Sequence, residues 1–326
     1  MATLYRDYDR AALDYQYNAR ATVPDFSVIT RQYAEESARA RATLPCVLDV
    51  AYGEHPDETL DVFPAARGGA GGLAPVFVFL HGGYWRLLSK DDSSSMAPAF
   101  TRAGAMLVAV NYSLAPAVTL DRIVDQIRRA MAWLHRNVAA HGGDPARIHV
   151  GGSSAGGHLT GMLLTDDWQG RYGVPADIVR GAAPLSGLFD LTPLVHTHIN
   201  EWMRLTPEDA ARNSPMLHLP ARPCPVVASH GENETDEFKR QTRDYVDALR
   251  ARGGEARYVA TPGSNHFDIV LRLNDPDAPI TRAIFEQMGL AGAGPAAADT
   301  AARARGAGAP ASTDSTGLAD RNARHS

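Results

Sequence analysis

Cysteine is scarce in this sequence, with Cys46 and Cys224 the only two among 326 residues. Two cysteines make neither a disulfide framework nor a thiolate metal site, so we expect two packed thiols in a reducing compartment. Long apolar runs are also missing, since no stretch approaches the roughly 20 residues that a membrane-spanning helix needs. Residues 1–20 are polar and charged and lack the apolar core of a secretory signal. The sequence therefore predicts a cytoplasmic protein with no membrane partner.

An excess of basic residues is missing as well. Lys and Arg number 32 against 37 Asp and Glu, which gives a net charge of −5. Because there is no basic stripe, nucleic acid is not an expected partner. The hydrophobic share of 44% and the charged share of 21% are ordinary for a globular protein, and 326 residues suit one domain with additional ends.

The sequence does contain a long alternation of strand and helix patterns. The run at 75–80 is apolar throughout, which is typical of a strand buried on both faces. The longest helix pattern, at 120–141, has apolar residues at helical spacing and ends at Gly142. The alternation predicts an α/β fold with a mostly parallel central sheet flanked by helices. Strands are expected at 47–52, 58–64, 75–80, 105–112, 148–153, 178–184, 225–230 and 256–260, and helices at 92–104, 120–141, 158–165, 237–252 and 279–288.

A glycine-rich turn lies between one of these strands and the helix that follows it. Its residues Gly152-Ser153-Ser154-Ala155-Gly156 match the G-x-S-x-G pattern of a nucleophile elbow. In such a turn the central serine has a strained backbone, and the glycines let the strand and the helix approach closely. We therefore predict that Ser154 is a nucleophile, next to a helix N-terminus that favours the negative charge of acyl transfer.

Acyl transfer by a serine needs a base, an acid that orients the base, and donors for the oxyanion. His266 lies in an expected turn at 262–267, where a loop can bring its imidazole to the elbow, so we predict that it is the base. The acid is expected after the strand that ends at His230, in the chain order serine, acid, histidine. Four carboxylates lie there, and spacing alone does not choose among them: Glu232, Glu234, Asp236 and Glu237.

A second glycine motif follows the strand at 75–80 and reads His81-Gly82-Gly83-Tyr84-Trp85. Glycine lets the backbone itself touch a substrate, and loops of this kind supply amide donors to a tetrahedral oxygen. We predict an oxyanion hole formed by the amides of Gly82, Gly83 and Ala155. The two motifs together are far more specific than either one alone.

We expect three regions along the chain. Residues 1–42 carry two helical patterns separated at Pro24 and form an N-terminal helical arm, which either packs over the domain or acts as a cap that covers the active site. Residues 43–292 form the catalytic domain, with a long irregular insertion at 186–218. Residues 293–326 have almost no large apolar side chains, so we expect a disordered low-complexity tail.

With these parts in place, the chain resembles the α/β-hydrolase superfamily, in the branch that carries His-Gly-Gly in its oxyanion loop. Residues 111–116, Asn-Tyr-Ser-Leu-Ala-Pro, are similar to a stretch of that branch. Within the branch the chain looks most like the kynurenine formamidases (arylformamidases), which share His-Gly-Gly-Tyr-Trp and a Glu-Phe-x-Arg-Gln-Ser motif similar to residues 237–242. The opening segments 17–20 and 23–25 are similar too, and the resemblance covers roughly residues 10–290.

The resemblance implies an α/β-hydrolase fold and a serine hydrolase that cleaves an aryl formamide, N-formylkynurenine in the family's tryptophan catabolism. It implies Glu234 as the triad acid, where the animal enzymes have Asp, and leaves Asp236 as the alternative. It also suggests that Tyr84 and Trp85 form an aromatic wall for the substrate, with packing under the loop as the alternative. The implied mechanism needs no metal and no organic cofactor.

Another function remains open, a carboxylesterase that acts on small acyl or aryl esters with the same residues. A dinucleotide-binding loop at 151–157 is not expected, because the adjacent Gly151 and Gly152 break the required G-x-G-x-x-G spacing. The expected partner is therefore a small aryl formamide or ester, and a homodimer is left open.

Overall fold

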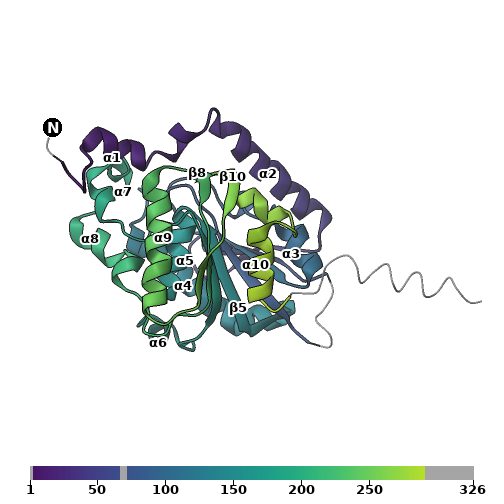
Figure 1. The fold of residues 1–326 in the computed structure, drawn as a ribbon. Coiled ribbons are helices and arrows are strands. Elements are labelled where there is room, and N and C mark those ends of the chain that lie inside the picture. Colours follow the sequence, from purple (N-terminus) through teal and green to yellow (C-terminus); the bar gives the residue numbers. More distant parts are fainter. Residues whose placement is uncertain (1–2, 67–71, 291–326) are drawn as a thin grey trace, which may run out of the picture. The chain divides into compact units, whose positions relative to one another are not determined.

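The computed structural model describes residues 3–66 and 72–290, and its arrangement is drawn in Figure 1. A central eight-stranded sheet has the order β1-β2-β4-β3-β5-β6-β7-β9. The neighbours from β4 to β9 are parallel, whereas β1 and β2 at one edge pair in antiparallel fashion. The predicted mostly parallel sheet is confirmed. Its strands are β1 (Val47–Ala51), β2 (Thr59–Phe63), β3 (Ala74–Leu80), β4 (Met106–Val110), β5 (Gly143–Ser153), β6 (Val179–Leu185), β7 (Val226–Ala228) and β9 (Ala256–Tyr258).

A second, two-stranded sheet was not expected from the sequence. Strand β8 (Gly231–Asn233) pairs in parallel with β10 (Thr261–Asn265), and Asn265 lies opposite Asn233. The prediction of a turn at 262–267 is therefore wrong over most of its length. Pro262 and Gly263 give this segment the local composition of a turn, and only a partner strand some 30 positions away makes it a strand.

Helices flank the sheet on both faces. Helix α5 begins at Ala155, three residues before the expected start, and α3 begins at Ala97, where Pro98 near its N-terminus favours a helix start. The α-helices are α1 (Arg10–Gln16), α2 (Phe26–Thr43), α3 (Ala97–Ala103), α4 (Leu120–Asn137), α5 (Ala155–Leu164), α6 (Gln169–Tyr172), α7 (Asn200–Met203), α8 (Pro207–Arg212), α9 (Asp236–Ala251) and α10 (Pro279–Gln287). Short 3-10 helices are η1 (Ala19–Thr22), η2 (Lys90–Asp92), η3 (Val138–His141), η4 (Thr192–His196), η5 (Pro215–Leu217) and η6 (Val270–Asn274).

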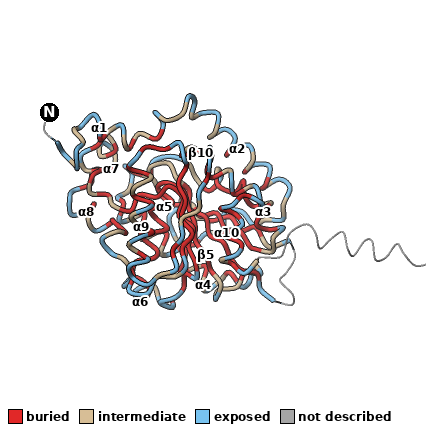
Figure 2. Tube along the Cα trace, in the orientation of Figure 1, coloured by how far each residue is buried: buried red, intermediate tan, exposed pale blue. Residues whose placement is uncertain are grey.

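The sheet divides the apolar core into two layers, because side chains alternate between the faces of a strand. On β3, Val76, Val78 and Leu80 pack in the layer of α4, α5 and α9, whereas Phe77 and Phe79 pack in the layer of α3 and α10. Figure 1 shows these two sets of helices on opposite sides of the sheet, and Figure 2 shows that the central strands between them are largely buried.

The helices of the expected N-terminal arm are α1, η1 and α2. Asp9 and Asp25 begin α1 and α2, since each carboxylate accepts a hydrogen bond from an amide of the first turn. The expected tail at 293–326 lies outside the described residues, and the division of the chain at residues 42 and 292 stays a prediction. Within residues 3–66 and 72–290, no helix combines the length and the apolar character needed to cross a bilayer.

Three of the buried histidines have a strongly lowered pKa, and this makes the stability of the fold depend on pH. Burial lowers the pKa of His81, His149 and His158 to about 4. In the unfolded chain an imidazole titrates near 6.5, so between about pH 6.5 and pH 4 the unfolded state binds protons that the folded state does not. We expect the free energy of unfolding to fall as the pH is lowered through this window, by on the order of 1–2 kcal/mol per histidine at pH 5.

Urea unfolding at pH 7 and pH 5 measures this loss. His149→Gln should make the pH dependence shallower, because one buried imidazole is removed. His218→Gln is the matched control at an exposed histidine and should keep the wild-type dependence. An equal loss of unfolding free energy between pH 7 and pH 5 in wild type and in His149→Gln would contradict the lowered pKa of His149.

Candidate functional site

The expected nucleophile lies at the sharp turn between β5 and α5. Ser154 has φ 57° and ψ −115°, a backbone conformation that costs a non-glycine residue energy. A Cβ at Gly156 would overlap the carbonyl oxygen of Leu80, and a Cβ at Gly152 would lie 2.6 Å from that oxygen. The two glycines of the motif therefore allow α5 to start directly against the end of β3. The amide of Ser154 donates to the carbonyl of Leu185 at 2.9 Å, which ties the turn to β6.

The short second sheet brings the expected base and one expected acid together. Glu234 follows β8 and His266 follows β10, so the pairing of these two strands sets the two side chains side by side. His266 Nδ1 lies 3.0 Å from Glu234 Oε2, and both side chains are buried. Asp236, the alternative acid, is an exposed residue in the first turn of α9. Of the four carboxylates in the acid loop, the structure pairs Glu234 with the imidazole.

The carboxylate of Glu234 is held at both of its oxygens. While Oε2 contacts His266, Oε1 accepts hydrogen bonds from the Ser186 hydroxyl at 2.6 Å and from the Gly231 amide at 2.5 Å. Burial acts to raise the pKa of Glu234, but the neighbouring imidazole and these hydrogen bonds hold it below the usual value. An ionised carboxylate only accepts hydrogen bonds, so Nδ1 of His266 is the donor and Nε2 is the basic nitrogen of the neutral ring.

The expected oxyanion donors lie around the same serine. A Cβ at Gly82 would lie 2.9 Å from the Ser153 carbonyl oxygen and 3.4 Å from the Cβ of Ser154, so the end of β3 passes beside the elbow. Gly83 has φ 99°, a conformation that glycine adopts readily. Within the described chain, no protein group accepts a hydrogen bond from the amide of Gly82 or Gly83. Ala155 is the first residue of α5, where an amide has no partner inside the helix.

A cavity of about 530 Å³ opens over these residues. Ser154, His266, Gly82, Gly83 and Tyr84 all line it. The N-terminal arm and the insertion at 186–218 both contribute residues to its wall. The further lining residues are Tyr17, Asn18, Ala19, Arg20, Phe26 and Tyr33 from the arm, and His198, Ile199 and Trp202 from the insertion.

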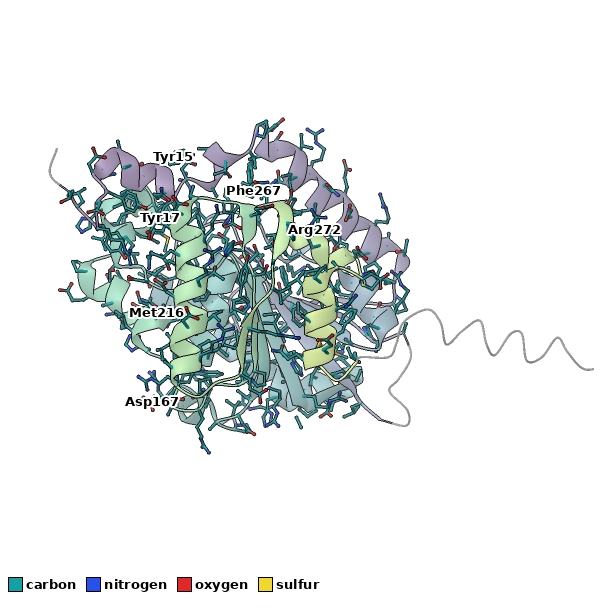
Figure 3. The ribbon with its side chains drawn as sticks, in the orientation of Figure 1. Tyr15, Tyr17, Asp167, Met216, Phe267 and Arg272 are labelled. Carbon is teal, nitrogen blue, oxygen red and sulfur yellow. The ribbon has the colours of Figure 1, made fainter. Side chains whose placement is uncertain are left out.

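One tyrosine fastens the arm to the site. The Tyr17 hydroxyl donates to Glu237 Oε2 at 2.9 Å and accepts from Gln241 Nε2 at 2.9 Å, while the Tyr84 hydroxyl donates to the Tyr17 carbonyl at 2.6 Å. Figure 3 labels Tyr17 and Phe267 where the arm crosses the top of α9 and β10. The sequence carried a signal for this contact, because Tyr17 and the Glu-Phe-x-Arg-Gln motif both belong to the segments that resemble the formamidases.

The expected aromatic wall is corrected by the structure. Trp85 is completely buried, packs edge-on against the His158 ring at a centroid distance of 5.0 Å, and does not line the cavity. The backbone turns Trp85 under the loop while Tyr84 faces the cavity. Trp202, from a part of the insertion that the sequence left without a role, lies 6.3 Å from the Tyr84 ring and lines the same cavity. Ser186 was also missed, and no local pattern pointed to it.

Metal ligands are not gathered at this site or elsewhere in the part of the chain that the structure describes. In residues 3–66 and 72–290, no three His, Cys, Asp or Glu side chains are arranged to hold a metal ion. The arrangement that is present suits covalent chemistry by a serine with an ionised carboxylate behind its histidine.

Comparisons with known proteins agree with this geometry. The profile of the alpha/beta hydrolase fold family matches residues 77–269. A kynurenine formamidase from Salmo salar is 35% identical over 261 residues, which are 78% of this chain and 86% of that protein. Esterase LipQ from Mycobacterium tuberculosis is 29% identical over 241 residues, or 68% of this chain and 57% of that protein.

Among solved structures, a protein from Silicibacter sp. TM1040 that was proposed to be a thioesterase superposes with a TM-score of 0.72. It is 27% identical, and the match covers 83% of this chain and 98% of that one. The resemblance drawn from the sequence motifs is thus confirmed. The chain is a hydrolase that belongs to the alpha/beta hydrolase fold family and, within it, to the branch of the kynurenine formamidases.

Proposed function

We propose that this hydrolase cleaves aryl formamides such as N-formylkynurenine, with Ser154 as the nucleophile. The observation that carries the proposal is the hydrogen bond of 3.0 Å between Glu234 and His266, because His266 and Ser154 line the same cavity. The similarity to a kynurenine formamidase over most of both chains supports the formamide as the substrate. The aromatic side chains of the cavity suit an aryl group.

The proposed reaction is an acyl transfer in two steps. His266 Nε2 takes the hydroxyl proton of Ser154, and the oxygen attacks the formyl carbon. The negative oxygen that forms is stabilised by the amides of Gly82, Gly83 and Ala155. The C–N bond then breaks as His266 gives its proton to the departing arylamine. Water, deprotonated by the same imidazole, attacks the formyl-enzyme, and formate leaves as Ser154 regains its proton.

In this scheme Glu234 orients the imidazole and stabilises its charged form. The Nδ1–H donates to the carboxylate, which keeps Nε2 free to accept the serine proton. Ser186 and Gly231 hold the other carboxylate oxygen, and two anchors on Oε1 restrict the extra rotatable bond that glutamate has compared with aspartate. We assign Ser186 as a positioning residue that acts through Glu234.

A carboxylesterase is the second candidate function, supported by the similarity to esterase LipQ. The same nucleophile, base and oxyanion donors would serve an ester. The two functions differ in the leaving group, because an arylamine must be protonated as it leaves and an alkoxide or phenoxide depends less on this step.

Turnover of N-formylkynurenine and of a short-chain aryl ester distinguishes these functions. We expect a higher kcat/KM for the formamide. Ser154→Ala should lower turnover of both substrates by at least about 10³-fold, because no nucleophile remains. Turnover of the ester alone would favour the esterase. Full activity of Ser154→Ala would rule out the elbow as the catalytic site.

Two carboxylates close together in sequence provide a matched test of the triad acid. Glu234→Gln should lower kcat by about 10³–10⁴-fold, since the imidazole loses the charge that orients it and stabilises its protonated form. Asp236→Asn, at an exposed position two residues away, should change kcat less than about twofold. Thermal unfolding of both variants verifies folding, and a large loss in Asp236→Asn alone would assign the acid to that residue.

The role of Ser186 can be separated from its effect on the fold, because its φ of 48° suits glycine better than alanine. Ser186→Ala and Ser186→Gly both remove the hydroxyl, so both should lower kcat by about tenfold. Loss of this hydrogen bond raises the pKa of Glu234. Because Ser186 does not line the cavity, the loss should appear in kcat and leave KM nearly unchanged in both variants. Kinetic effects that follow the difference in thermal stability between Ala and Gly would indicate a structural role instead.

A further inference from the structure

Two exposed arginines line the cavity, and they come from segments far apart in the chain. Arg20 comes from η1 of the arm, and Arg86 follows the glycine loop at the end of β3. Each guanidinium lies over an aromatic ring that also lines the cavity, Arg20 over Phe26 at 4.5 Å and Arg86 over Trp202 at 4.9 Å.

Neither guanidinium has a charge partner among the described residues. Salt bridges occupy Arg122, Arg212 and Arg240 elsewhere in the chain, but none involves Arg20 or Arg86. Asp92 is the one acidic side chain among the residues that line the cavity. Its Oδ2 already accepts from the amide of Ser89 at 3.1 Å and from the Ser89 hydroxyl at 3.3 Å.

The two groups have the properties of a carboxylate site. A guanidinium stacked on a ring has a restricted orientation, so it loses less freedom when a ligand binds. Its planar set of N–H donors matches a carboxylate. The wall below is largely aromatic and aliphatic, and a cavity of about 530 Å³ has the size of a small-molecule site. A ligand that fits has an aromatic body near Ser154 and an anionic end near the two arginines.

We infer that Arg86 and Arg20 bind the carboxylate of the substrate, so that the enzyme selects aryl formamides with an amino-acid head over those without one. This inference rests on the proposed function and names the substrate class of the same site. It makes the two arginines specificity-determining residues, with no part in the bond changes at Ser154.

The test compares N-formylkynurenine with N-formylkynuramine, which has the same aryl formamide but lacks the carboxylate. We expect wild type to have at least a tenfold higher kcat/KM for the first. In Arg86→Gln and Arg20→Gln the ratio of the two kcat/KM values should fall about tenfold, through KM rather than kcat. The ratio for Arg86→Lys should lie between those of wild type and Arg86→Gln, because lysine keeps the charge and loses the planar donors.

Arg243→Gln is the matched control. Arg243 is an exposed arginine over the Tyr258 ring at 5.9 Å and does not line the cavity, so this variant should keep the wild-type ratio. Equal kcat/KM values in wild type, or an unchanged ratio in Arg86→Gln and Arg20→Gln, would overturn the inference while formamide hydrolysis stands.

A binding measurement separates the inference from the proposed function. Calorimetric titration with kynurenine and with kynuramine needs no turnover. We expect wild type to bind kynurenine more tightly than kynuramine. Arg86→Gln should lower the affinity for kynurenine about tenfold, and Arg243→Gln should leave it unchanged. This result supports the carboxylate site even if neither formamide is hydrolysed. Equal affinity for the two amines would overturn it.

Discussion

The contact between the start of α5 and the ends of β3 and β5 is the constraint on which the site depends. A Cβ at Gly156 would overlap the Leu80 carbonyl oxygen, so the helix can start there only with glycine. The chain then turns with Ser154 at φ 57°. Because β3 and β5 are neighbours in the sheet, this turn also sets the serine beside Gly82, and the free amides of the glycine loop come to lie around it. The proposed nucleophile and the proposed oxyanion donors are thus consequences of one close packing contact.

The proposed acid and the proposed base depend on a separate and smaller element. Strands β8 and β10 lie outside the main sheet, and their pairing sets Glu234 beside His266. A glutamate has one more rotatable bond than the aspartate of the animal enzymes. Here the Ser186 hydroxyl and the Gly231 amide hold its second oxygen, and burial keeps water from competing for these hydrogen bonds.

The cavity is completed by parts that do not belong to the sheet. Tyr17 joins the arm to α9 through Glu237 and Gln241, and to the glycine loop through Tyr84. The insertion adds Trp202 against Tyr84. The proposed carboxylate site draws on both segments, with Arg20 on the arm and Arg86 stacked on Trp202 of the insertion. The proposed bond-breaking step is therefore assigned to residues at the ends of strands, and the proposed selection of the substrate is assigned to exposed arginines that line the cavity.

The sequence by itself determined the alternation of strands and helices, the elbow at Ser154, the glycine loop at 82–83 and the position of His266 after the last strand. These features are local, because periodicity, turn glycines and the order of motifs depend on residues close together in the chain. For the acid, motif spacing left four carboxylates open and the resemblance implied Glu234, and the tertiary structure sets Glu234 and not Asp236 against His266. Tertiary structure alone decided that Ser186 supports Glu234, that the segment at 261–265 is a strand, and that Trp202 replaces Trp85 in the cavity wall. Each of these rests on contacts between residues about 30 to more than 100 positions apart. Burial and hydrogen bonding at such separations follow from how the elements pack, which no short stretch of sequence encodes.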